Sequence, residues 1–228
     1  PFIANKIPTI KEFHSSGATI TKPKSITDKL KYQLFLLLNR YTLKVVLNQD
    51  EIKYYPFDNI QVIPNFITIK NFYPTPKENI IIAAGRIALV KQFDHLIEAW
   101  AKIAHKIPNW EVHIYGEGEE QLTQQLQKQI NQLEVPRIIL KGATQKLDEK
   151  MNKAAIFAMT SKTECFPMVL LEAQAAGMFV VSYDCPNGPR NIIIHNENGL
   201  LVANQNINQF ANELLKIINH PETLKKTA

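Results

Sequence analysis

Cysteine is scarce in this chain of 228 residues. The two cysteines, Cys165 and Cys185, cannot form the framework of several disulfides that stabilises small secreted domains. No Cys-x-x-Cys pair and no Cys/His cluster has the spacing of a zinc site. The sequence therefore predicts a reducing compartment, the cytoplasm, and no metal site.

Long hydrophobic runs are also missing. The best candidate for a membrane span, from Tyr32 to Leu47, is interrupted by Asn39, Arg40 and Lys44, well short of the about 20 residues that a bilayer requires. The chain opens at Pro1 without the charged and then apolar segments of a secretory signal, and it has no initiator Met. We expect a segment that starts inside a longer protein.

The composition is that of an ordinary globular protein, with 45% hydrophobic and 21% charged residues. Lys and Arg number 26 against 21 Asp and Glu, which gives a net charge of +5 and indicates an anionic partner of unspecified chemistry. Basic and aromatic residues are not interleaved as in nucleic-acid-binding proteins, so no nucleic-acid partner is expected.

The second part of the chain has the pattern of a doubly wound α/β domain. Apolar runs rich in Ile and Val alternate there with segments of helical period, and continuous apolarity is typical of parallel strands covered on both faces. Such sheets bind ligands beyond the carboxyl ends of their strands, where the strand order reverses. The predicted strands are Ile80–Ala84, Val112–Tyr115, Ile138–Leu140, Ile156–Met159 and Phe179–Ser182.

The first part of the chain lacks a complete fold. We expect an amphipathic helix over Ser25–Tyr41, a strand over Leu43–Leu47, a short helix over Gln49–Tyr55 and a strand over Ile60–Ile63. The prolines and polar residues of Phe72–Asn79 predict a linker. The predicted domains are an incomplete one over residues 1–73 and a Rossmann-like one over residues 74–228.

A glycine and two cations follow the first predicted strand of the α/β domain. Gly85 allows a tight turn, and Arg86 and Lys91 come before the helical segment Phe93–Lys106. A planar guanidinium and a compact ammonium together suit a diphosphate. The alternative is two solvated basic residues in a loop.

A second turn, Tyr115 to Glu120, carries a Gly-x-Gly pattern. The third glycine of a dinucleotide fingerprint is missing, and Glu117, Glu119 and Glu120 would repel phosphate. A tight turn into a helix with an acidic first turn is the favoured interpretation.

Two carboxylates flank the start of another predicted helix. Pro167 suits the first helical position, so the N–H groups of Met168 and Val169 are expected to be unsatisfied and able to bind an anion. Glu164 precedes this helix, and Glu172 lies in its second turn. Carboxylates accept hydrogen bonds from hydroxyls, so sugar rings are their natural partners. The alternative is one capping and one surface acid.

Loop geometry alone explains the turn residues of Asp184 to Asn191 and of Asn198-Gly199. Five histidines are scattered without the spacing of a ligand set, which indicates surface or packing roles; they are His95, His105, His113, His195 and His220.

Together these residues resemble a known pattern. The order Gly85-Arg86, Lys91, Glu164 and Glu172 with seven residues between, then Ala175-Ala176-Gly177 and Asn198-Gly199, is similar to the nucleotide-sugar half of the GT-B, family 4 (group 1) retaining glycosyltransferases. The resemblance covers about Val62 to Val202. Val62–Asn65 resembles the hinge between the two domains of that family. Ile7–His14 resembles a late strand of the acceptor-side domain, ending in a histidine near the reaction centre.

The resemblance implies a role for each matched residue. Arg86 and Lys91 would bind the donor diphosphate and stabilise the departing nucleotide without a metal or cofactor. Glu164 would hold hydroxyls of the donor sugar, and Glu172 those of the ribose. The expected catalytic residues are Glu164, Arg86, Lys91 and His14, and the expected donor-binding residues are Gly85, Arg86, Lys91, Gly142, Thr144, Glu164, Phe166, Met168, Val169 and Glu172.

The resemblance further implies transfer of a hexose or N-acetylhexosamine, with retention, from a nucleotide sugar to a glycan or lipid-linked acceptor in cell-surface polysaccharide synthesis. UDP is the expected nucleotide. A fragment with one complete half would be inactive alone, because both halves must close over the substrates. The alternatives are a non-catalytic nucleotide-sugar-binding module and, less favoured, an NAD-dependent oxidoreductase.

The basic segment Lys22 to Arg40 allows a further expectation. Its lysines lie beside leucines and Phe35, as in helices that dock on anionic membranes, here the inner face of the plasma membrane. A helix buried in the incomplete domain is the alternative.

Overall fold

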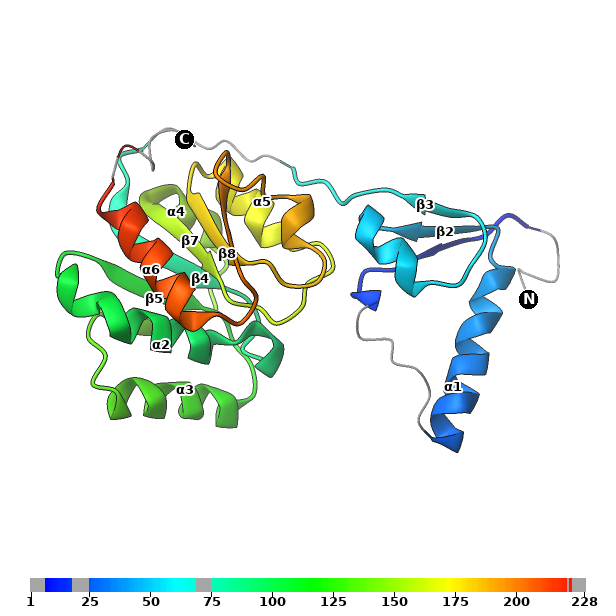
Figure 1. Ribbon diagram of the computed structural model, residues 1–228, viewed down its shortest axis with the longest axis horizontal. Helices are drawn as coiled ribbons and strands as arrows, with labels where there is room; N and C mark the ends of the chain where they lie inside the picture. Colours follow the sequence, from blue (N-terminus) through cyan, green and yellow to red (C-terminus); the bar gives the residue numbers. More distant parts are fainter. Residues whose placement is uncertain (1–6, 18–24, 69–74, 221, 223–228) are drawn as a thin grey trace. The chain divides into compact units, whose positions relative to one another are not determined.

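The structure is a computed structural model that describes residues 7–17, 25–68, 75–220 and 222 (Figure 1). It divides into two compact units. Unit 1 takes its described residues from Pro1–Phe66, Thr163–Phe166 and Pro186–Gly188. Unit 2 takes them from Ile67–Lys162, Pro167–Cys185 and Pro189–Ala228. Each unit is described by itself.

In unit 1, three described strands form a parallel sheet in the order β1-β2-β3. The α1 helix begins with a capping box, in which Ser25 and Asp28 each accept a hydrogen bond from the other's backbone N–H. The elements are β1 (Ile10–Glu12), α1 (Ile26–Leu36), η2 (Leu37–Arg40), β2 (Leu43–Val46), η3 (Gln49–Tyr54) and β3 (Ile60–Val62).

The sequence predicted these elements with three corrections. The expected strand Ile7–His14 is only the three residues of β1, and His14 lies two residues beyond its end. The predicted helix that begins at Ser25 changes to a 3-10 helix at Leu37. The segment after Asn48 is also a 3-10 helix, which its short length and the Asn48 cap favour.

In unit 2, six described strands form one parallel sheet in the order β6-β5-β4-β7-β8-β9. The chain adds β5 and β6 on one side of β4 and then crosses to β7 on the other, so the strand order reverses between β4 and β7. The strands are β4 (Glu78–Ala84), β5 (Glu111–Tyr115), β6 (Ile138–Gly142), β7 (Ala154–Met159), β8 (Phe179–Tyr183) and β9 (Gly199–Val202).

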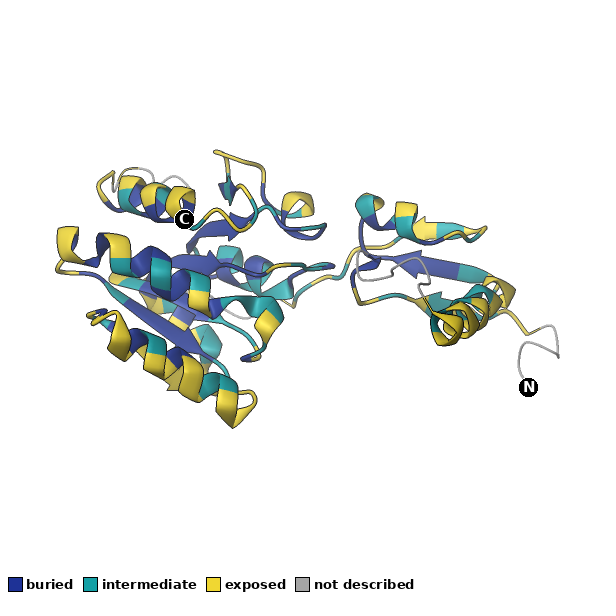
Figure 2. Cartoon of the chain, turned by 60° about the horizontal axis from the view of Figure 1, so that its bottom comes forward, coloured by how far each residue is buried: buried dark blue, intermediate teal, exposed yellow. Residues whose placement is uncertain are grey.

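Helices cover both faces of this sheet (Figure 1). One apolar core joins the sheet to α2, α3 and α6, with Trp100 and Phe210 fully buried. The other joins it to α4 and α5 through Met151 and Leu170. Figure 2 shows the resulting pattern, with buried strands and helices exposed on their outer sides. The helices are α2 (Phe93–Ile103), α3 (Glu120–Gln132), α4 (Leu147–Lys153), α5 (Met168–Ala175) and α6 (Ile207–Ile218).

The doubly wound parallel fold predicted from the sequence is confirmed. All five predicted strands are present, each within two residues of its expected ends. The prediction missed β9, whose glycine at Gly199 makes it look like a turn. The helix that begins at Phe93 ends at Ile103 and continues as a 3-10 turn. The predicted linker Phe72–Asn79 lies partly outside the described residues, and β4 already begins at Glu78.

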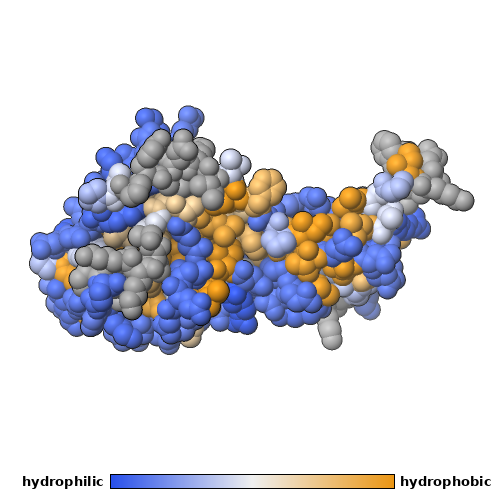
Figure 3. All heavy atoms as spheres, turned by 90° about the horizontal axis from the view of Figure 1, so that it is seen from above, coloured by the Kyte–Doolittle hydropathy of each residue, from blue (hydrophilic) through white to orange (hydrophobic). Residues whose placement is uncertain are grey.

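Apolar patches interrupt the hydrophilic surface in the view of Figure 3. The α1 helix exposes Ile26, Leu30 and Leu34. The predicted membrane-docking segment begins at Lys22, which lies outside the described residues together with Lys24, so docking stays a prediction. Within the described part of the chain, no helix combines the length and apolarity needed to cross a membrane.

Lys77, which directly precedes β4, donates hydrogen bonds to the carboxyl ends of two helices of unit 2. The ammonium of Lys77 donates to the carbonyl oxygens of Asn152 at 2.9 Å and Met151 at 3.4 Å, in the last turn of α4. It also donates at 2.5 Å to Ala176, which caps α5. Carbonyls at helix ends are unsatisfied and carry partial negative charge, so they favour a cation. Burial nevertheless lowers the pKa of Lys77 to about 8.

This pKa predicts a pH dependence of stability. Between about pH 8 and the ordinary value of 10.5, the unfolded chain holds a proton on Lys77 that the folded chain has lost, so stability due to this group rises with pH. The free energy of unfolding of the wild type, relative to a Lys77→Met variant, should therefore increase between about pH 7.5 and about pH 9.5 in urea titrations. Parallel pH profiles of the two proteins would contradict this account.

Candidate functional site

The site begins where the turns after β4 and β5 pack against each other. Gly85 donates its N–H to the carbonyl of Tyr115 at 3.0 Å, and Ile87 donates to Glu117 at 2.8 Å. A Cβ on Gly116, whose φ is +152°, would lie 1.9 Å from the Gly85 carbonyl oxygen. The glycine of this turn therefore serves the close approach of two backbones, as the favoured tight-turn interpretation requires.

A cavity of about 630 Å³ opens at the carboxyl ends of β4, β5 and β6. Its volume is within the range of about 300–1,000 Å³ that is typical of small-molecule sites. Three predicted donor-binding residues line it, namely Gly85, Arg86 and Thr144. The other lining residues are Ala84, Tyr115, Gly116, Glu117, Gly118, Ala143 and Leu147.

A left-handed residue, Gly142, directly precedes Ala143 and Thr144 of the cavity lining. Gly142 has a φ of +70°, and nothing lies within 4 Å of the position that a Cβ would occupy. Its carbonyl accepts a hydrogen bond from Gly116 at 2.9 Å, which ties the end of β6 to the turn after β5. Burial raises the pKa of Tyr115, so its hydroxyl remains a neutral donor and acceptor.

Two cationic residues, Arg86 and Lys91, follow the end of β4. The side chain of Lys91 lies over Gly85, with Cε 3.3 Å and Nζ 3.7 Å from the point where a Cβ of that glycine would be. Arg86 is exposed and lines the cavity next to Gly85. Because Gly85 has no side chain, the Lys91 side chain can pass close to the backbone at that position. The binding of a diphosphate by Arg86 and Lys91 stays a prediction.

The segment after β7 holds the backbone of Lys91. The hydroxyl of Thr160, 2% exposed, lies 3.2 Å from the carbonyl of Lys91 and 2.8 Å from that of Gln92, and it donates to them. Lys162 donates its N–H to Val90 at 2.7 Å. Gln92 is left-handed, with a φ of +46°, and these bonds stabilise that conformation. The two loops at the reversal of strand order are thus fastened to each other.

The helix expected to bind phosphate begins one residue later than predicted. Pro167 is the N-cap of α5, with an extended ψ of 93°, and Met168 is the first helical residue. Proline fits here because its φ of −74° suits either position. Met168 and Val169 thus open the first turn, whose N–H groups have no partner within the helix. Glu172 follows in the second turn, as predicted.

The remaining predicted residues belong to unit 1. His14 is exposed, and its Nε2 lies 3.1 Å from a carboxylate oxygen of Glu12. Glu164 and Phe166 lie in the segment Thr163–Phe166. The backbone of Glu164 pairs with Asn187 in a parallel bridge. The structure thus brings Gly85, Arg86 and Thr144 to one cavity of unit 2, with the Lys91 side chain over Gly85, and holds His14, Glu164 and Phe166 in unit 1.

The sequence did not single out three residues as part of the site: Gly116, Glu117 and Thr160. Gly116 and Glu117 were assigned to a structural turn, yet they also line the cavity, because β5 is the immediate neighbour of β4. Thr160 carried no motif; its position directly after a predicted strand next to the strand-order reversal was the available signal. Among the described residues, no group of three His, Cys, Asp or Glu side chains could hold a metal ion.

Comparison with known proteins identifies the family. A family model for "Glycosyl transferases group 1" matches residues 65–228. The chain belongs to this family. The resemblance noted in the sequence is therefore confirmed.

Two curated relatives and one solved structure illustrate the similarity. An uncharacterized glycosyltransferase of Haemophilus influenzae is 30% identical over 164 residues, which cover 70% of this chain and 45% of that protein. The poly(ribitol-phosphate) alpha-N-acetylglucosaminyltransferase of Staphylococcus aureus is 29% identical over 216 residues, which cover 92% and 42%. A mutant of S. aureus TarM in complex with Fondaparinux, alpha-GlcNAc-glycerol and UDP superposes with a TM-score of 0.84 and 25% identity, over 96% of this chain and 45% of that one. The group 1 glycosyltransferase chain thus spans less than half the length of these relatives.

The close packing of the two turns predicts how much stability is lost when their glycines are replaced by alanine. Gly116→Ala would force a methyl group into the Gly85 carbonyl, so the turns must separate, and we expect a loss of about 2–4 kcal/mol in unfolding free energy. Gly142→Ala is the matched control, since its Cβ meets nothing and only the positive φ costs about 1–2 kcal/mol. Urea denaturation of both variants measures the difference; equal losses would contradict the close-packing argument.

Proposed function

We propose that the protein is a retaining glycosyltransferase that moves a hexose or N-acetylhexosamine from a UDP-sugar to a glycan or lipid-linked acceptor in cell-surface polysaccharide synthesis. The observation that carries the proposal is the position of two cationic residues around Gly85. Arg86 lines the cavity at the carboxyl end of β4 together with Gly85, and the side chain of Lys91 lies over Gly85. Family membership and the polymer-modifying relative of S. aureus support the reaction class.

The cavity suits the nucleoside end of the donor. Its walls combine apolar surface with main-chain groups of the turns after β4, β5 and β6, which could bind the edge of a base around Gly142–Thr144. Glu172, in the second turn of α5, would accept hydrogen bonds from ribose hydroxyls. The complex of TarM with UDP supports UDP as the nucleotide.

The two cations supply the chemistry at the diphosphate. When the bond between the sugar and the diphosphate breaks, negative charge grows on the departing phosphate oxygens. A guanidinium and an ammonium already fixed in place stabilise that charge without reorganising, which lowers the barrier. The N–H groups of Met168 and Val169 at the start of α5 would add hydrogen bonds to phosphate oxygens. The proposal includes no metal and no cofactor.

The sugar and acceptor ends involve residues of unit 1. Glu164 would accept hydrogen bonds from donor-sugar hydroxyls, Phe166 would contact the donor, and His14 would lie near the reacting carbon. Transfer with retention needs both parts of the enzyme closed around the substrates, so nucleotide binding, rather than transfer, is the property to test in this chain.

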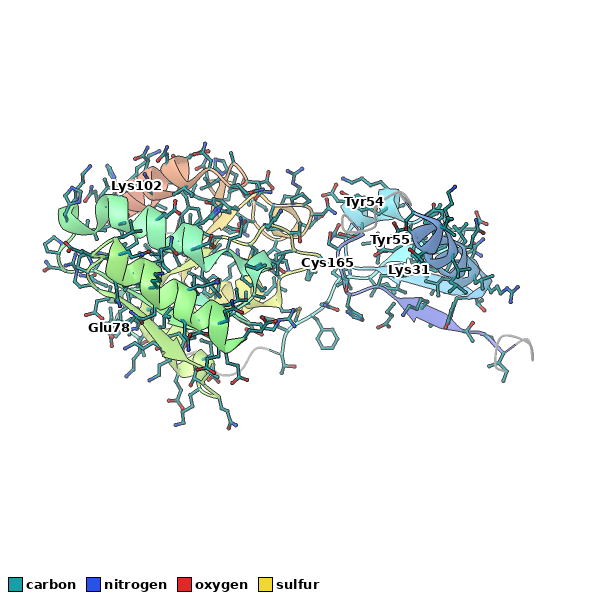
Figure 4. All side chains as sticks on the ribbon, turned by 90° about the horizontal axis from the view of Figure 1, so that it is seen from below. Lys31, Tyr54, Tyr55, Glu78, Lys102 and Cys165 are labelled. Carbon is teal, nitrogen blue, oxygen red and sulfur yellow. The ribbon has the colours of Figure 1, made fainter. Side chains whose placement is uncertain are left out.

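Calorimetric titration with UDP tests the assignment. The wild-type chain should bind UDP, and Lys91→Met should weaken binding about 10- to 100-fold, because a charge-assisted hydrogen bond to phosphate is lost. Lys102→Met is the control: Lys102 is an exposed lysine of α2 outside the cavity, labelled in Figure 4, and its loss should leave the affinity unchanged. Equal binding by all three proteins, or no binding at all, would remove the donor site.

Thr160 gives a second, indirect test. Thr160→Val keeps the shape of the side chain but removes the hydroxyl that fastens the carbonyls of Lys91 and Gln92. We expect UDP affinity to fall about 3- to 10-fold, because the ammonium is less well positioned. The same titration measures it, and an unchanged affinity would show that the loop keeps its place without this bond.

A further inference from the structure

A buried carboxylate of unit 1 accepts hydrogen bonds from three other residues. Glu51, in η3, is 1% exposed. Its Oε1 accepts from the hydroxyl of Ser16 at 3.1 Å and from the amide of Asn187 at 2.9 Å. Its Oε2 accepts from the N–H of Gly17 at 2.6 Å. Burying a carboxylate costs free energy unless it is well hydrogen-bonded. The three donors therefore stabilise the buried charge, and the charge in turn fixes the positions of the donors.

The donors come from segments that carry proposed site residues. Ser16 and Gly17 follow His14 by two and three residues. Asn187 lies beside Glu164 in the bridge between the two loop segments of unit 1.

Three main-chain hydrogen bonds fix Glu164 in that bridge. Its N–H donates to Pro186 at 2.9 Å, and its carbonyl accepts from Asn187 and Gly188, both at 2.8 Å. The position of the Glu164 backbone therefore follows the position of the 186–188 segment, and Glu51 holds that segment through the Asn187 side chain.

A second contact ties the same loop to η3. The amide of Asn48, 3% exposed, donates to the carbonyl of Cys165 at 2.7 Å, while its side-chain oxygen caps η3 by accepting from the N–H of Glu51 at 3.1 Å. Tyr54 donates to the Asn187 side-chain oxygen at 3.4 Å. Tyr54, Tyr55 and Cys165 are labelled in Figure 4.

The Cys165 thiol reports the charges around this loop. Its pKa is raised to about 12, first by burial and then by the carboxylates of Glu51 and Glu164. The thiol therefore stays neutral.

From these contacts we infer that Glu51 is a positioning residue for the donor sugar. It fixes the loop that carries Glu164 to the segment that follows His14, while its own carboxylate is buried and fully engaged by its donors. The inference rests on the proposed function, in which Glu164 binds sugar hydroxyls. Disturbing the contacts of Glu51 should therefore weaken the binding of a UDP-sugar, because the sugar contacts are lost, and should leave the affinity for UDP itself unchanged.

A charge swap between Glu51 and Asn187 tests this role. Asn187→Asp would place two carboxylates against each other, and we expect the dissociation constant of the UDP-sugar to rise at least about tenfold while that of UDP stays within about twofold. Adding Glu51→Gln to this variant places an amide donor opposite the new carboxylate at position 187. The double variant should therefore recover the affinity for the UDP-sugar. Asn109→Asp, in an exposed turn of unit 2, adds the same charge and should change neither constant.

Asn48→Ser is a milder variant in case the buried carboxylate pair prevents folding. Its hydroxyl can still cap η3, but the donor to Cys165 is gone, so sugar-dependent affinity should fall while UDP affinity holds. Circular dichroism spectra check that each variant is folded.

The probes are UDP, UDP-glucose, UDP-N-acetylglucosamine and UDP-galactose, titrated into each protein. Failure of the wild type to bind UDP would remove the proposed function itself. If UDP binds, the positioning role is overturned by any of three results: no sugar changes the affinity of the wild type, the variants weaken UDP and UDP-sugar equally, or the swap restores nothing.

Discussion

The close approach of the turns after β4 and β5 is the constraint on which the cavity at the carboxyl end of the sheet depends. Gly116 comes so near the carbonyl of Gly85 that no other residue fits there, and this contact continues the pairing of the two strands beyond the sheet. The cavity walls are therefore main chain held by hydrogen bonds. A rigid wall of this kind orients a ligand before it binds, which reduces the entropy cost of binding.

The reversal of strand order explains why the loop that carries Lys91 contacts the loop after β7. The loops after β4 and β7 are neighbours only because the chain crosses over β4, and Thr160 joins them by hydrogen bonds to the backbone at Lys91 and Gln92. The side chain of Lys91 lies over Gly85, where a Cβ would be in tight contact with it. The left-handed Gln92 and the buried hydroxyl of Thr160 hold the backbone from which this side chain extends.

Unit 1 shows how a buried charge can organise loops. Glu51 and Asn48 lie in or next to η3, and they hold both segments that surround Glu164. Because each donor would be left unsatisfied if the carboxylate were removed, the network favours one arrangement over others nearby.

The sequence by itself determined the parallel sheet and the cations after β4, because continuous apolar runs and Gly-Arg before a helix are local patterns. It missed β9 and placed the start of α5 one residue early, since Gly199 and Pro167 fit turns as well as element ends. Only the tertiary structure decided that Gly116 and Glu117 share a cavity with Gly85, and that a buried Glu51 organises Asn187. Those relations join residues 31 to 136 positions apart, and no local pattern in a single sequence carries information about such contacts.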